Sequence, residues 1–216
     1  LASNNHGTSV AGVAAARGDN GIGVAGAAYE AEIVGYRLIS GPISDRDIAE
    51  SQSRSSDIID VYNNSWGPGN LFRLTTSGPQ TLAAIEDTTT NGRGGLGSII
   101  VFSAGNSGPD SDTNYAPLQG SRHTITVAAS TNEGTAAAYT TPGATVVVSA
   151  PSNGGTLGIT TTDRTGAEGY DDPENYTNTF GGTSSAAPLV SGIIALMLEA
   201  NPNLSYRDVT DILART

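Results

Sequence analysis

An apolar run near the carboxyl end constrains this chain more than any other stretch. Nearly every residue from Leu189 to Leu198 is apolar or very small. A helix built from such a run is hydrophobic on all sides, so the run predicts a helix buried in the core. Directly before it, among small residues, stands Ser184. We therefore expect Ser184 at the mouth of a core helix, where unpaired N–H groups favour negative charge. A serine at a helix start is also the usual N-cap, so a catalytic role requires partners elsewhere in the chain.

The composition restricts the class of protein. With 216 residues, 37% of them hydrophobic, the chain can form one substantial core, and we expect one domain over residues 1–216. A net charge of −11 with 10 Lys and Arg argues against nucleic acid as a partner. Without cysteine, the chain has no thiolate catalysis and no cysteine-bound zinc. No stretch has the pattern of a membrane span or signal peptide, and we interpret the chain as an internal piece of a longer protein.

Short apolar strands alternate with helical segments. Helices are expected over residues 6–16, 45–56 and 81–90, and after Ser205, where Asp208 completes a capping-box pattern. Strands are expected over residues 32–39, 58–63, 98–102, 124–129 and 145–148. This alternation predicts an α/β fold, a doubly wound and mostly parallel sheet with helices on both faces, in three layers.

A serine nucleophile needs a base, and the chain has two histidines to supply one. His123 lies in a strand-like stretch, where a packed or surface histidine is the better interpretation. His6 begins a helix of small residues, which is a rigid mount with little reason to carry an imidazole for packing alone. From the local sequence, a structural and a catalytic His6 are equally supported.

Several separate motifs resemble the subtilisin family of serine proteases, in the same chain order. The segments His6-Gly7-Thr8 and Gly182-Thr183-Ser184-Ser185-Ala186-Ala187-Pro188 resemble its histidine and serine motifs. Residues 92–99 and 198–208 look like the kexin and furin branch of that family. Together these segments cover almost the whole chain.

The resemblance implies a role for each matching residue. Ser184 would be the nucleophile, His6 the general base, and Asn106 the amide donor to the oxyanion, together with the Ser184 N–H. Asn106 alone would otherwise be read as part of a turn. The resemblance also implies two backbone edges that flank the substrate peptide. The side chain of the substrate residue directly before the cleaved bond would pass between them. These edges are Ser65, Trp66 and Gly67, and Ser103, Ala104 and Gly105. Both could equally be ordinary turns at strand ends.

The resemblance further implies a catalytic aspartate upstream of the histidine. The first carboxylate in this sequence, Asp19, follows His6 and stands in a turn. We therefore expect that the piece begins after the aspartate, and that in this form it has little or no activity.

A structural calcium ion is the expected cofactor. Residues 18–24 resemble the family's calcium loop, which would make the Asn20 side chain and the carbonyls of Gly18, Ile22 and Val24 ligands. Hard oxygen donors of this kind suit calcium. An Asp-Asn-Gly turn without metal is the alternative.

The chain departs from the kexin and furin branch where that branch has acidic residues around the first subsite. Here Gly69-Asn70-Leu71 and Ala116-Pro117 occupy those places, and Asp110 and Asp112 are nearby but do not match position for position. The glutamate of a second calcium site is replaced near residues 140–142. Because an unpaired guanidinium is costly to bury, we expect strict cleavage after basic residues to be lost or weakened.

Two rival interpretations remain. Residues 92–97 have the G-x-G-x-x-G spacing of a dinucleotide site, but they precede a strand where that motif would follow one, so we predict a helix-to-strand turn. The second rival is a non-catalytic protein-binding module on the same fold. The resemblance favours a secreted, monomeric serine endopeptidase acting on polypeptides.

Overall fold

The computed structural model describes residues 4–67, 73–171 and 174–216. Its centre is a parallel sheet in the order β1-β2-β3-β4. The strands are β1 (Val61–Asn64), β2 (Ile99–Ser103), β3 (Ile125–Ser130) and β4 (Val146–Pro151). Val61 pairs with Ile99, and β3 shifts register against β4 between Thr126 and Val127. Four of the five expected strands are thus confirmed, with ends displaced by up to three residues.

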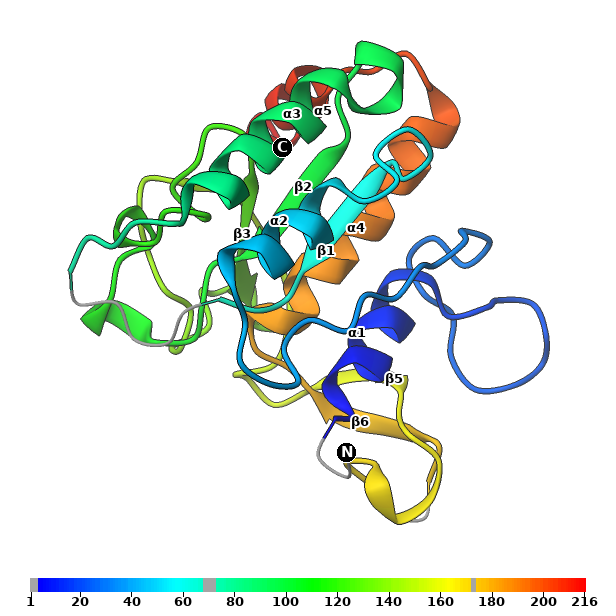
Figure 1. Ribbon diagram of the computed structural model, residues 1–216. Helices are drawn as coiled ribbons and strands as arrows, with labels where there is room; N and C mark the ends of the chain where they lie inside the picture. The colour runs from blue at the N-terminus through cyan, green and yellow to red at the C-terminus, as the bar shows by residue number, and fades with distance from the viewer. Residues whose placement is uncertain (1–3, 68–72, 172–173) are drawn as a thin grey trace.

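Both faces of this sheet are covered. All five residues of β2 are buried, and they alternate between two apolar clusters. Ile99 and Val101 face α4 (Thr183–Ala200) and α5 (Tyr206–Ala214). Ile100 and Phe102 face Ile85 of α3 (Pro79–Gly95), with α2 (Asp45–Ser53) beside it. Figure 1 shows α2 and α3 on one side of the sheet and α4 on the other. The predicted three-layer α/β fold is confirmed.

Helix α1 (His6–Ala15) packs against α4 and against a two-stranded antiparallel ribbon that the sequence analysis did not predict. The ribbon consists of β5 (Ile159–Thr162) and β6 (Tyr176–Phe180). Thr161 and Thr162 donate their hydroxyls to the carbonyls of Ser9 and Thr8, both at 2.8 Å. Gly12 permits this approach, because a Cβ there would lie 2.1 Å from Thr162 Oγ1. Short 3-10 turns complete the described elements: Gly108–Asp110, Thr113–Tyr115 and Gly166–Glu168.

Residues 32–39, expected to be a strand, form neither strand nor helix. No backbone group of this segment pairs with another described residue, and Ile33 and Val34 are 52% and 61% exposed. An apolar run acquires strand geometry only when a neighbouring strand accepts its hydrogen bonds, and this run has none among the described residues.

Helix α4 begins and ends close to the predicted positions, but it is not buried on every side. Ile193 and Leu196 are 41% and 43% exposed, because the sheet and α1 cover only part of its circumference. By length and composition α4 could cross a membrane, but 56% of it is buried inside the fold, as is typical of the core helix of a globular domain.

The glycine-rich stretch after residue 91 is a helix-to-strand turn, as predicted, and not a phosphate loop. Helical geometry is broken at Gly92, and Arg93 and Gly94 have φ of +49° and +66°. Gly97 has φ of +83°, and a Cβ there would lie 2.2 Å from the Thr89 carbonyl oxygen. The capping box of α5 is also confirmed, since Ser205 N donates to Asp208 at 2.8 Å and Asp208 N donates to Ser205 at 3.3 Å.

Candidate active site

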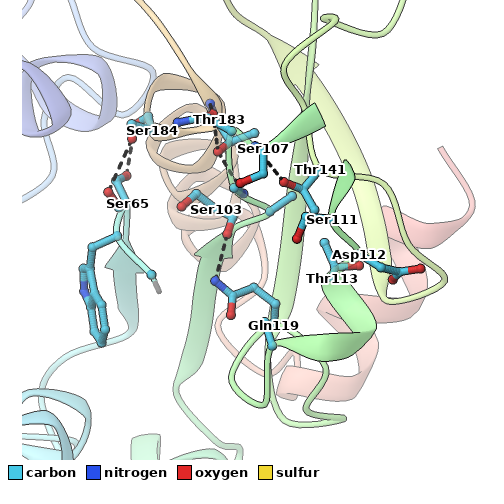
Figure 2. Close-up of a pocket in the computed structure, with 16 residues that line it drawn as sticks. Ser65, Ser103, Ser107, Ser111, Asp112, Thr113, Gln119, Thr141, Thr183 and Ser184 are labelled. Atoms are coloured by element: carbon cyan, nitrogen blue, oxygen red, sulfur yellow. Dashed lines mark hydrogen bonds between the residues drawn. The ribbon is translucent and has the colours of Figure 1, made fainter. Parts of the chain in front are cut away.

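The candidate site lies where β1 and β2 end and α4 begins. Ser65, Trp66 and Gly67 follow β1, while Ser103 ends β2 and leads into residues 104–106. The carboxyl ends of parallel strands meet at one edge of a sheet, so these two segments lie side by side. They line a cavity of about 310 Å³ together with Asn106 and Ser184 (Figure 2). The structure therefore brings the two expected substrate edges, Asn106 and Ser184 together.

Ser184 is the second residue of α4, and the N-cap is Gly182, with φ of +74° and no side-chain cap. The interpretation of Ser184 as an N-cap is therefore wrong. Pro188 lacks the N–H that would bond the Ser184 carbonyl within the helix. Ser65 Oγ donates to that carbonyl instead, at 3.0 Å, and Ser184 Oγ donates to the Ser65 carbonyl at 3.4 Å. These reciprocal contacts hold the serine beside the first substrate edge.

Asn106 is held to the start of the same helix by its amide oxygen. Asn106 Oδ1 accepts from the Thr183 N–H at 2.8 Å and from the Thr183 hydroxyl at 3.0 Å. Thr183 Oγ1 in turn accepts from the Gly105 N–H at 3.1 Å. Because both partners of Asn106 Oδ1 are donors, the oxygen must face them, and Nδ2 is left as a donor without an acceptor among the described residues.

A second donor lies beside this amide. Thr183 N donates to Asn106 and Ser185 N donates to the Gly182 carbonyl, whereas Ser184 N has no acceptor among the described residues. An unpaired N–H in the first turn of a helix is the group that stabilises an oxyanion. The start of α4 thus presents two donors, Ser184 N–H and Asn106 Nδ2, at the same edge of the cavity.

His6 is the first residue of α1 and does not line this cavity. Its half-buried ring packs edge-on against Phe180, with centroids 5.6 Å apart, two residues before Gly182. In the described part of the chain, neither Ser184 nor any carboxylate forms a hydrogen bond with the imidazole. Burial lowers the pKa of His6 below its ordinary value of 6.5, so the ring is neutral at pH 7 and can accept a proton. Because His6 forms no hydrogen bond with Ser184 in this structure, its role as the general base stays a prediction.

His123 lies away from the cavity. Its Nδ1 is 2.8 Å from Thr89 Oγ1, Arg122 Nε donates to Nε2 at 3.1 Å, and the ring stacks on Tyr206. This is the packed histidine that the sequence favours at this position.

The expected calcium ligands form an exposed turn after α1. Asn20 Oδ1 accepts from the Ile22 N–H at 3.0 Å, and Asp19, Gly21 and Gly23 all have positive φ. No described N–H donates to the carbonyls of Gly18, Ile22 or Val24. No group of three or more acidic or histidine side chains gathers in the described residues, and the four expected donors are neutral oxygens. Their type fits calcium, while their number falls short of the six to eight ligands it usually takes.

The cavity also contains residues that the sequence analysis missed. Ser111, Thr113 and Thr141 contribute hydroxyl groups, and Gln119 contributes a buried amide. No motif marks them, because they come from the loops and turns that precede and follow β3. Of the two nearby aspartates, Asp112 lines the cavity and Asp110 does not; Ala116 lines it too, and residues 69–71 lie outside the described residues.

The family model that matches this sequence is that of the subtilase family, and it matches residues 1–216. The chain belongs to the subtilase family. This subtilase is 37% identical to neuroendocrine convertase 2 of Drosophila melanogaster, over 99% of this chain and 32% of the relative. It is 38% identical to the human proprotein convertase subtilisin/kexin type 7, over 99% of this chain and 27% of the relative. The resemblance to the kexin and furin branch is thus confirmed.

Solved structures agree with the assignment. A serine protease of Aeromonas sobria, in complex with its chaperone, superposes with a TM-score of 0.88 at 26% identity, over 99% of this chain and 43% of that one. A second protein, sphericase, gives a TM-score of 0.71 at 26% identity, over 98% of this subtilase and 69% of the other chain. The subtilase spans about a third of the length of the curated relatives it matches.

Proposed function

We propose that this subtilase is the peptidase domain of a serine endopeptidase that cleaves polypeptides through an acyl-enzyme intermediate. The observation that carries the proposal is the cavity at the start of α4. A serine hydroxyl, two donors for an oxyanion and two backbone edges line this one cavity of about 310 Å³. Acyl transfer by serine requires this set of groups.

In the proposed reaction, the substrate backbone lies between the segments 65–67 and 103–105. Ser184 Oγ bonds to the carbonyl carbon of the scissile peptide while its proton passes to His6. The negative charge that develops on the carbonyl oxygen is stabilised by Ser184 N–H and Asn106 Nδ2. The protonated imidazole then donates to the leaving amine, and water repeats the sequence to release the acid.

His6 is the proposed base because it begins α1, which packs on α4, and because burial keeps its imidazole neutral at pH 7. The Ser184 hydroxyl now donates to the Ser65 carbonyl at a long 3.4 Å, so it could turn toward a base at little cost. Catalytic hydrogen bonds are often long before substrate binds. By family resemblance, we propose that an aspartate upstream of His6 orients the imidazole.

The same cavity supports a specificity other than strict cleavage after basic residues. Ala116 lines it and is 2% exposed, where the kexin and furin branch carries a carboxylate by resemblance. An ammonium or guanidinium entering here would lose its hydration and meet a single carboxylate among the described lining residues, that of Asp112, which already accepts from the Asn114 N–H. We propose that neutral residues are accepted before the cut.

We also propose that calcium stabilises the turn at residues 18–24, held by Asn20 Oδ1 and the carbonyls of Gly18, Ile22 and Val24. Its four proposed ligands are neutral oxygens, so the ion would act by fixing these oxygens in one arrangement. Adding calcium after chelation should raise the thermal midpoint of the parent protein, and Asn20→Ala should abolish most of that rise. Equal midpoints with and without calcium would contradict this site.

The alternative is a protein-binding module that has lost activity. The parent protein and its Ser184→Ala variant distinguish the two. Each is incubated with a mixed peptide library in calcium, and every cut is identified by mass spectrometry. Cuts made by the wild type alone support the peptidase. If neither folded protein cuts after any propeptide is removed, the binding module takes its place.

By family resemblance we further propose that the protein is exported and monomeric.

A further inference from the structure

Gln119 lies between the two substrate edges, the segments 65–67 and 103–105, and lines the cavity between them. Its side-chain amide donates from Nε2 to the Ser103 carbonyl at 3.2 Å. The same nitrogen would lie 2.7 Å from a Cβ placed on Gly67. Nε2 thus touches one edge and lies against the other. Figure 2 shows the amide between the strand that carries Ser65 and the segment that carries Thr113.

The amide oxygen of Gln119 has no hydrogen-bond partner among the described residues. The Ser103 carbonyl can only accept a hydrogen bond, so the nitrogen must face it and Oε1 must turn the other way. Gln119 is 3% exposed, and Oε1 is one of two buried side-chain polar atoms without a hydrogen-bond partner in the described part of the chain. A buried acceptor without a donor is costly to the folded state, so a native site of this kind usually receives a water or a ligand.

The surroundings of Oε1 are polar and nearly uncharged. Ser103, Ser111 and Thr113 line the same cavity with hydroxyl groups. Among the described lining residues Asp112 alone carries a carboxylate, and its Oδ1 accepts from the Asn114 N–H at 2.8 Å as the cap of the turn 113–115. The group that would bind at Oε1 is therefore a neutral donor.

We propose that Gln119 Oε1 selects, as the residue before the cut, an uncharged side chain that ends in a hydrogen-bond donor, such as Tyr or Gln. This inference rests on the proposed peptidase function and specifies its substrate class. A pocket that hydrogen-bonds a substrate group rejects a matching side chain that lacks the group, because its own polar atom is then left unpaired. Phe and Met, which have similar shapes and no such donor, should therefore be cleaved more slowly.

The test uses the full-length parent protein and peptides that differ only in the residue before the cut: Tyr, Phe, Gln, Met, Lys and Ala. The quantities compared are the kcat/KM ratios Tyr/Phe and Gln/Met. In the wild type we expect both ratios to be about tenfold, the contribution of one neutral hydrogen bond. In Gln119→Met both should fall toward one.

A matched control is Gln52→Met, which removes the other buried glutamine amide, one paired with Asn64 in both directions. Its ratios should stay at the wild-type values. Ratios near one in the wild type, a preference for Lys over all others, or ratios that persist in Gln119→Met would each overturn the proposal. If Gln119→Met does not fold, the wild-type ratios alone decide.

Failure of the proposed function would look different. In that case the wild type would cleave none of the peptides, Ala included, or Ser184→Ala would cleave them equally well. Cleavage of the Ala peptide by the wild type alone, without a donor preference, would keep the peptidase and remove only the role of Gln119.

Discussion

Asn106→Ala should destabilise the fold as well as the reaction, because Asn106 supplies the start of α4 with a cap from a distant part of the chain. Gly182 has no side chain to cap the helix, and Asn106 Oδ1 accepts from both donors of Thr183, at 2.8 and 3.0 Å. Thr183 is fully buried. Loss of a helix cap costs about 0.5–2 kcal/mol, and leaving buried donors unpaired moves the cost toward the upper end. We expect the free energy of unfolding to fall by about 1–2 kcal/mol.

Asn106→Asp separates this structural role from the proposed catalytic one. A carboxylate keeps the acceptor that Thr183 needs, and its charge is favourable at a helix N-terminus. It has no N–H to give to an oxyanion. The Asp variant should therefore unfold at nearly the wild-type denaturant concentration. In the parent protein, both variants should lose about 10²–10³-fold in kcat, the range known for an oxyanion asparagine of subtilisin itself.

The assay is urea unfolding of wild type, Asn106→Ala and Asn106→Asp, with fluorescence of the single tryptophan, Trp66, as the probe. At about 2–4 °C per kcal/mol for a chain of this size, the Ala variant should also melt about 2–8 °C lower. The reasoning is refuted if Asn106→Ala unfolds at the wild-type concentration, or if Asn106→Asp is as unstable as Asn106→Ala.

Three further predictions follow from contacts elsewhere. In the NMR spectrum, with His123→Gln used for assignment, His6 should titrate below pH 6.5. Because the unfolded chain then binds more protons than the folded one, the free energy of unfolding should fall as pH drops from about 6.5 through the folded pKa. A titration midpoint above 6.5 would contradict the burial argument. The Arg93 side chain is 6% exposed and donates to Asp60 and to the carbonyls of residues 97, 202 and 204. Arg93→Ala should therefore lower the free energy of unfolding by about 2–3 kcal/mol. As a control, Arg46→Ala, in the exposed pair with Glu50, should change the unfolding midpoint little. Gly97→Ala should lower the thermal midpoint clearly, because it combines a positive φ with a 2.2 Å clash against backbone; a midpoint equal to that of wild type would show that the turn can move.

Much of the sheet could be predicted from the sequence because its strands are buried on both faces. The runs at residues 98–102 and 124–129 are mostly apolar, and such runs are typical of a covered parallel sheet. Residues 32–39 carry a similar signal, yet they form no strand, since strand formation depends on a neighbour that the run itself does not specify. The ribbon β5-β6 was missed for the opposite reason: its threonine-rich strands have little apolar alternation, and its hydroxyls bond to α1.

The candidate site was predictable only in part. The motif around Ser184 and the segments 65–67 and 103–106 could be found in the sequence, and the structure brings them to one cavity. Gln119 could not, because it comes from an irregular loop and its importance rests on an unpaired atom that only three-dimensional packing reveals. The hydrogen bond from Ser65 to the Ser184 carbonyl was equally hidden, although a proline four residues after Ser184 does predict a carbonyl unpaired within the helix.

The central claim is that Ser184 is the nucleophile, and covalent labelling tests it most directly. The parent protein, with calcium, is treated with a peptidyl phosphonate ester, a reagent that phosphonylates activated serines, and its proteolytic peptides are analysed by mass spectrometry. The account predicts one phosphonyl adduct on the peptide that contains Ser184, its absence in Ser184→Ala, and at least a tenfold slower rate of labelling in Asn106→Asp. No adduct on the folded protein, or an adduct on another serine that persists in Ser184→Ala, would contradict it.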